Sequence, residues 1–174
     1  MVAVKLKGKH QEASTEEIRG MVQAVASILE MGKLSLRSGG NQILVEFVKR
    51  EALGINHLTG GKNGGLAYPT LGKMKIMQDA NTENLFTIII HEAIHLYLNL
   101  TEQATSTLTA RLKPDIVAIY GVLVANVYQR AAYLAHCRKG MAYFPKGADK
   151  YNDQQWQKEG VEALGKKHRK KKVA

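Results

Sequence analysis

Cysteine is nearly absent from this sequence, and no apolar stretch in it is long. Its 174 residues include a single cysteine, Cys137, so an internal disulfide is impossible and disulfide-stapled secreted domains are excluded. The longest apolar run, residues 116–125, is too short to span a bilayer. Residues 1–11 lack the continuous apolar segment of an export signal. These absences predict a soluble protein of the reducing cytoplasm.

Acidic residues are also few, with 15 Asp and Glu against 25 Lys and Arg and a net charge of +10. The excess is uneven, because residues 138–174 hold 11 basic and 4 acidic residues, a net of +7 that leaves +3 for the rest. We therefore predict a single folded domain at 14–144 between an N-terminal arm, 1–13, and a basic, disordered tail, 145–174.

The end of that tail is the most basic segment of the chain. Its cations can neutralise the phosphates of a nucleic acid, which predicts weak, salt-dependent and non-specific binding. The other interpretation is a terminus that only keeps the protein in solution. No aromatic residue is interleaved for base stacking. The cations concerned are Lys166, Lys167, Arg169, Lys170, Lys171 and Lys172.

The first half of the chain predicts one helix followed by short strands. Residues 14–32 begin with Ser and two acids and continue with apolar residues at helical spacing. Alternating or β-branched stretches predict strands at 34–37 and 43–48, and two more, 66–68 and 73–77, flank a glycine-rich turn region.

The second half predicts helices, which gives an α+β fold overall. Residues 85–100 are apolar on nearly every face and should form a buried helix that Asn81 caps. A second helix should start at Thr101 and end near residue 112. Pro114 then favours the start of a third helix, 115–137, because proline is tolerated at a helix start but not inside one.

The buried helix carries the motif HEAIH at residues 91–95. Residues four apart project from one helical face, so His91 and His95 can both reach one zinc ion. Glu92 lies beside them, where it can accept a proton from a coordinated water as general base. Burying three ionisable groups among isoleucines is costly unless they are liganded.

A catalytic zinc needs a third protein ligand. The metzincin pattern fails, because residue 101 is Thr and no glycine precedes it. Glu102 begins the next helix, which the short connection can fold back onto the first. His136 and Asp115 are the other options.

Together, the segments TIIIHEAIHL (87–96), EQA (102–104) and LTARL (108–112) resemble the small gluzincin-type metallopeptidases of phages and bacteria, related in architecture to the SprT and ImmA/IrrE groups. The resemblance implies a zincin-like fold, a Zn²⁺ cofactor with Glu102 as third ligand, and hydrolysis of peptide bonds. It also implies that a strand within 66–77 pairs with an extended protein or peptide substrate.

Three side chains remain candidates for stabilising the oxyanion, whereas Tyr97, two residues from His95, should point away from the metal. The candidates are Tyr120, Tyr128 and His136. Three other histidines lie in predicted loops or tails and should be solvated: His10, His57 and His168. The competing hypothesis is a nucleic-acid-associated binding or structural protein with a structural metal site or none.

Overall fold

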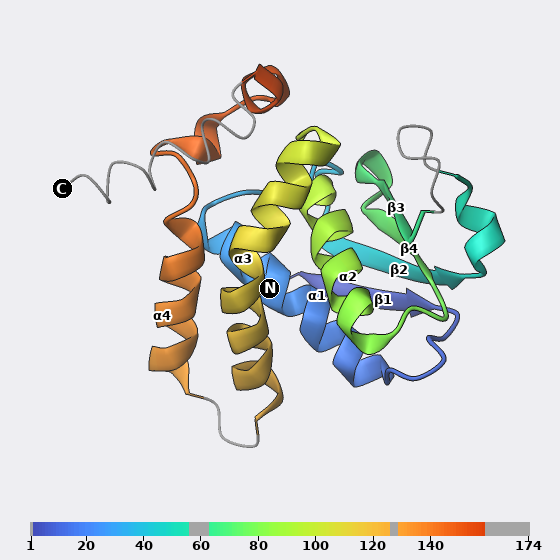
Figure 1. The fold of residues 1–174 in the computed structure, drawn as a ribbon. Coiled ribbons are helices and arrows are strands. Elements are labelled where there is room, and N and C mark those ends of the chain that lie inside the picture. Colours follow the sequence, from blue (N-terminus) through green and yellow to red (C-terminus); the bar gives the residue numbers. More distant parts are fainter. Residues whose placement is uncertain (1, 56–62, 126–128, 159–174) are drawn as a thin grey trace.

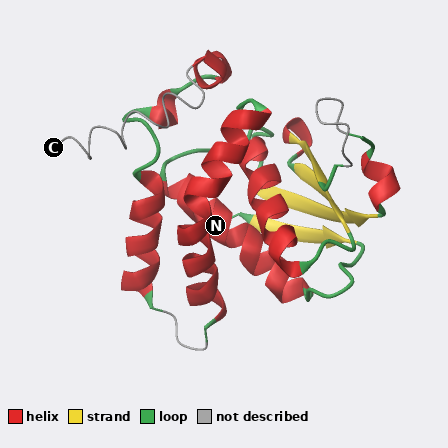
Figure 2. Cartoon of the chain, viewed as in Figure 1, coloured by secondary structure: helices red, strands yellow, loops and turns green. Residues whose placement is uncertain are grey.

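The computed structural model describes residues 2–55, 63–125 and 129–158, which form a small mixed sheet beside a group of helices (Figures 1 and 2). In these residues the sheet contains β1 (Ala3–Lys7), β2 (Gln42–Val48), β3 (Gly65–Tyr68) and β4 (Lys73–Met77). The strand order is β1-β2-β4-β3, with β1 and β4 parallel to β2 and β3 antiparallel at the edge. The α+β class and the strands predicted at 43–48, 66–68 and 73–77 are confirmed.

The helices pack in two layers on the sheet. Helices α1 (Thr15–Met31) and α2 (Thr82–Tyr97) contact the strands directly. Helix α3 (Glu102–Val124) packs on both of them, and α4 (Arg130–Met141) packs on α3 and α1 (Figure 1). Helix α2 is therefore enclosed by the sheet, α1 and α3, which explains why it is apolar on nearly every face.

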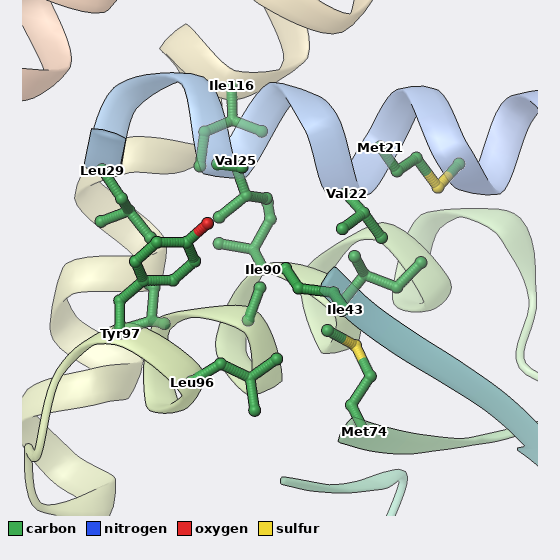
Figure 3. Close-up of a cluster of buried hydrophobic side chains, with 14 of the residues drawn as sticks. Met21, Val22, Val25, Leu29, Ile43, Met74, Ile90, Leu96, Tyr97 and Ile116 are labelled. Atoms are coloured by element: carbon green, nitrogen blue, oxygen red, sulfur yellow. The ribbon is translucent and has the colours of Figure 1, made fainter. Parts of the chain in front are cut away.

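Alternating residues of the strands build the core below the helices. In β2, Ile43 and Val45 are fully buried and Phe47 nearly so, while the residues between them are half-buried. Figure 3 shows Ile43 and Met74 from the sheet packed among side chains of α1, α2 and α3. This core fixes α2, and with it the HEAIH motif, against the sheet.

Side-chain caps define the helix starts as the sequence predicts. The Ser14 hydroxyl accepts a hydrogen bond from the Glu17 amide at 3.2 Å, and the Asn81 carboxamide oxygen accepts one from the Asn84 amide at 3.0 Å. Each satisfies an amide that has no partner within its helix. Helix α1 ends at Gly32, also as predicted.

The strand predicted at 34–37 is wrong. This segment is an irregular loop in which Leu34 and Leu36 are buried, so the alternating pattern reflects a loop that packs on the core. The backbone amide of Arg37 donates to the carbonyl of Leu96 at 2.9 Å rather than to a neighbouring strand. Lys33 has a left-handed φ of 62°, which breaks the extended conformation before the segment.

The helix start predicted at Pro114 is also wrong, because α3 continues through Pro114 to Val124. Proline removes one helical hydrogen bond, but Leu108, Leu112 and Ile116 are completely buried on both sides of it. Burying that continuous apolar face outweighs the lost bond. The predicted third helix therefore does not exist as one element, and α4 begins separately at Arg130.

The predicted N-terminal arm contributes β1, and His10 just after it is buried rather than solvated as predicted. The ring Nδ1 of His10 accepts from the amides of Glu12 and Ala13 at 3.1 and 2.9 Å, so Nε2 carries the proton and donates to the Ala80 carbonyl at 2.6 Å. These bonds join the start of α1 to the start of α2. His57 and His168 lie outside the described residues.

Part of the predicted C-terminal tail packs on the domain. Trp156 is 3% exposed and makes an edge contact with Tyr151, with ring centroids 5.1 Å apart. The carboxamide of Gln157 donates to that of Asn99 at 2.8 Å, in the connection between α2 and α3. The rest of the tail, 159–174, lies outside the described residues.

Candidate metal centre

Helix α2 places His91 and His95 one turn apart on the side that faces β3 and the start of α3. Both imidazoles are half-buried, and their Nε2 atoms are 3.3 Å apart. The rings meet edge to face, with centroids 4.9 Å apart. The two nitrogens therefore converge on one point, as the spacing of the motif predicts.

The α2–α3 connection brings Glu102 to that point. Leu98 and Leu100 are buried and anchor the connection, and the Thr101 hydroxyl caps α3 by accepting from the Ala104 amide at 3.2 Å. Glu102 follows at once, and its two carboxylate oxygens lie 2.9 Å from the Nε2 atoms of His91 and His95. One carboxylate thus contacts both imidazoles.

The separation of the two histidine nitrogens fits a zinc ion. Two nitrogens bound about 2.0–2.1 Å from one tetrahedral zinc lie about 3.3–3.4 Å apart. The two histidine nitrogens match this distance, and one ligand atom from each of the three residues falls within 4.8 Å of the others. Two imidazoles and a carboxylate are also a donor set that catalytic zinc uses.

Neighbouring groups hold the two histidines in place. The Ser106 hydroxyl, one turn after Glu102 on α3, lies 3.5 Å from Nδ1 of His91. The Arg37 guanidinium donates to the carbonyl of His95 at 3.3 Å and lies 3.6 Å from the carboxylate of Asp153. Burial lowers the pKa of His95, against the opposing effect of Glu102, and so favours the neutral imidazole that binds metals.

Glu92 lies beside the histidines but is nearly enclosed, with 9% of its surface exposed. Burial, and to a smaller extent the charge of Glu102, raises the pKa of its carboxyl to about 8. A cation held by the neighbouring residues would lower this pKa again. A carboxyl that titrates near neutral pH is suited to general acid–base chemistry.

Two glycines let the edge strand approach α2 at this carboxyl. A Cβ at Gly65 would lie 2.9 Å from Cγ of Glu92 and 2.9 Å from Cγ2 of Ile88. A Cβ at Gly64 would lie 2.8 Å from Cδ1 of Ile88. A side chain at Gly65 would therefore displace Glu92, Ile88 or the strand, whereas one at Gly64 would displace only the end of Ile88.

A cleft of about 680 Å³ runs between β3 and the two helices, and the three convergent side chains and Glu92 line it. The strand side and the nearby loop are largely apolar, through Ile55, Leu66 and Pro69. The helix side is polar, with Thr87 and Ser106 beside the histidines.

The other predicted site residues lie elsewhere. His136 and Asp115 pair with each other at 3.3 Å, Nδ1 to Oδ1, and neither lines the cleft. Tyr97 points away from the site as predicted, since its buried hydroxyl donates to Glu30 at 3.1 Å. Tyr120 packs on Phe86 instead, with ring centroids 5.4 Å apart.

Some predictions fall outside the described residues. Tyr128 is one of them, and so are all six cations proposed for nucleic-acid binding: Lys166, Lys167, Arg169, Lys170, Lys171 and Lys172. Sequence reasoning in turn missed Ser106 and Gly65. Ser106 follows Glu102 by four residues, and this spacing indicates that both side chains lie on the same face of the helix. The approach of Gly65 to Glu92 has no such signal, because it depends on tertiary packing.

No protein-family model, curated protein or solved structure significantly matches this chain. Among the described residues, no helix combines the length and apolar character needed to cross a membrane.

Proposed function

We propose that the protein is a zinc-dependent metallopeptidase with a zincin-like active site. The observation that carries the proposal is the convergence of His91, His95 and Glu102 at the floor of an open cleft, with the buried carboxyl of Glu92 beside them. The order of elements supports it: a helix, a mixed sheet, the helix with the HEAIH motif, and a helix that supplies the carboxylate.

In this mechanism His91, His95 and Glu102 would hold the ion. When bound, zinc supplies a Lewis acid that polarises the peptide carbonyl and lowers the pKa of a coordinated water. Ser106 contacts the outer ring nitrogen of His91 and would help to orient that imidazole, while Arg37 holds the backbone at His95.

Glu92 moves the proton. Its carboxylate accepts a proton from the attacking water as the oxygen adds to the carbonyl carbon, and then gives that proton to the amine nitrogen as the C–N bond breaks. The edge strand β3 offers backbone groups along the cleft, and an extended substrate can pair with them. Gly65 keeps this strand close to Glu92.

The test is hydrolysis of a fluorogenic peptide library by the purified chain. We expect turnover with one zinc per chain, loss of turnover with a chelator, and recovery on adding zinc. His91→Ala and His95→Ala should lose zinc and turnover together. Zinc retained in either variant, or no turnover from the zinc-loaded wild type with any peptide, would contradict the proposal.

A further inference from the structure

The cleft has a second polar feature one helical turn from the histidines. The side-chain ammonium of Lys113 donates a hydrogen bond of 2.7 Å to the hydroxyl of Thr87, which lines the cleft. Thr87 precedes His91 by four residues, so the two share a face of α2. The ammonium therefore contacts a residue of the cleft wall that lies one helical turn from His91.

The ammonium has capacity for another partner. Lysine carries three N–H donors, and the Thr87 hydroxyl takes one and itself points to the Glu83 carbonyl at 3.4 Å. Among the ion pairs formed by the described residues, none includes Lys113. A half-buried cation without an acidic partner favours an anion from outside the chain.

Helix geometry directs this lysine toward the site. Glu102, Ser106 and Lys113 follow at i, i+4 and i+11, which places them within about 40° of one another around α3. Side chains on a helix lean toward its N-terminus, and the N-terminus of α3 is where Glu102 lies. The four residues from His91 back to Thr87 span about 6 Å along the helix, which is slightly less than the length of two extended residues.

We infer that Lys113 and Thr87 form a subsite that binds a carboxylate of the substrate one or two residues from the bond that is cut. This inference rests on the proposed function, and it names the substrate class as peptides with an anionic group near the cleavage site. The carboxylate belongs either to the peptide's C-terminus or to an Asp or Glu side chain, and both present the same chemistry to an ammonium and a hydroxyl.

The subsite is tested by peptide binding and not by hydrolysis. A failure of the subsite can then be distinguished from a failure of the proposed peptidase function. The probes are fluorescein-labelled peptides of alanine and leucine with a free C-terminus, the same peptides as C-terminal amides, and amides that carry Glu or Gln at one position. Fluorescence anisotropy measures their affinity for the Glu92→Gln chain in zinc-containing buffer. Three further proteins carry a second substitution in the Glu92→Gln chain. Two of them change the subsite, with Lys113→Met or Lys113→Arg, and the control is Lys139→Met on the exposed surface of α4.

We expect about 10- to 100-fold tighter binding of at least one carboxylate peptide than of its neutral partner, as for a charge-assisted hydrogen bond. Lys113→Met should abolish this preference, whereas Lys113→Arg and Lys139→Met should keep it. The peptide pair that shows the preference identifies the source of the carboxylate. The subsite would be overturned, even if hydrolysis is observed, by either of two results. One is equal affinity for the free and amidated C-termini and also for the Glu and Gln peptides. The other is a preference for a carboxylate peptide that survives Lys113→Met. A preference that depends on Lys113 in a chain that hydrolyses nothing would retain the subsite and reject the peptidase.

Discussion

At the scale of single residues, Glu102 makes the most consequential contact, because its carboxylate touches both histidines at 2.9 Å. Removing it leaves two imidazoles, which hold zinc poorly. We predict that Glu102→Ala weakens zinc affinity by more than about 100-fold in a competition assay, since even indirect supporting residues cost about 10- to 100-fold.

The matched control for Glu102 is Asp115→Ala on the same helix, whose carboxylate pairs with His136 away from the cleft. Its zinc affinity should equal that of the wild type. Similar zinc affinities for Glu102→Ala and Asp115→Ala would move the third ligand elsewhere.

His10 tests a purely structural assignment at the same scale. Alanine at this position leaves two part-buried amides and the buried Ala80 carbonyl without their partner, at a cost of roughly 1–3 kcal/mol for each group that water cannot reach. We predict that His10→Ala lowers the free energy of unfolding by about 2–4 kcal/mol in urea titrations. His10→Asn should lose clearly less, because its carboxamide oxygen can take the place of Nδ1 as acceptor. Equal losses would show that the ring acts through packing on Phe47 alone.

At the scale of elements, the contact between β3 and α2 decides where the Glu92 carboxyl lies. The methyl group in Gly65→Ala would approach Cγ of Glu92 to 2.9 Å, so the carboxyl or the strand must shift. We predict a fall in peptide turnover of about tenfold or more with zinc content unchanged, because misplacing a reacting group by about 1 Å can cost 100-fold.

The control for the glycine change is Gly121→Ala on the exposed face of α3, where a Cβ meets nothing within 4 Å. It should keep full turnover and gain stability, as helical Gly→Ala changes do. Wild-type turnover in Gly65→Ala would mean that this close approach does not position Glu92.

Element starts were predictable where a local signal sets them. Ser14, Asn81 and Thr101 each cap a helix with their own side chain, within three residues of chain. The prediction at Pro114 was wrong because the free energy lost with one helical hydrogen bond is smaller than the free energy gained by burying α3 on both sides of the proline. That burial depends on packing against α1 and α2. The alternating Leu34 and Leu36 misled because a buried loop can show the same pattern as a strand.

At the scale of the whole molecule, the candidate site was predictable as far as it lies within α2 and one short connection. His91, Glu92 and His95 share one helix, and Glu102 follows after six residues. The opposite wall of the cleft comes from β3, and Lys113, three turns after Glu102 on α3, contacts Thr87 in the helix wall. These contacts join segments whose relative placement the sequence does not encode locally.

Zinc should also stabilise the whole domain, because its candidate ligands lie on two different helices that must be folded to converge. At a free zinc concentration about 100 times Kd, binding adds about 2.7 kcal/mol to the free energy of unfolding. For a chain of this size we predict a rise in Tm of about 5–10 °C on adding zinc, measured by differential scanning calorimetry. His95→Ala should show no comparable rise, and a zinc-independent Tm in the wild type would argue against a bound ion.

The most direct test of the central claim is the turnover of Glu92→Gln measured at one zinc per chain. Glutamine keeps the size of the side chain but cannot accept the proton, while His91, His95 and Glu102 remain unchanged. We predict full zinc occupancy, a native fold and a fall in peptide hydrolysis of about 10²–10⁴-fold. Turnover within about threefold of the wild type, in a variant that still holds one zinc, would contradict it.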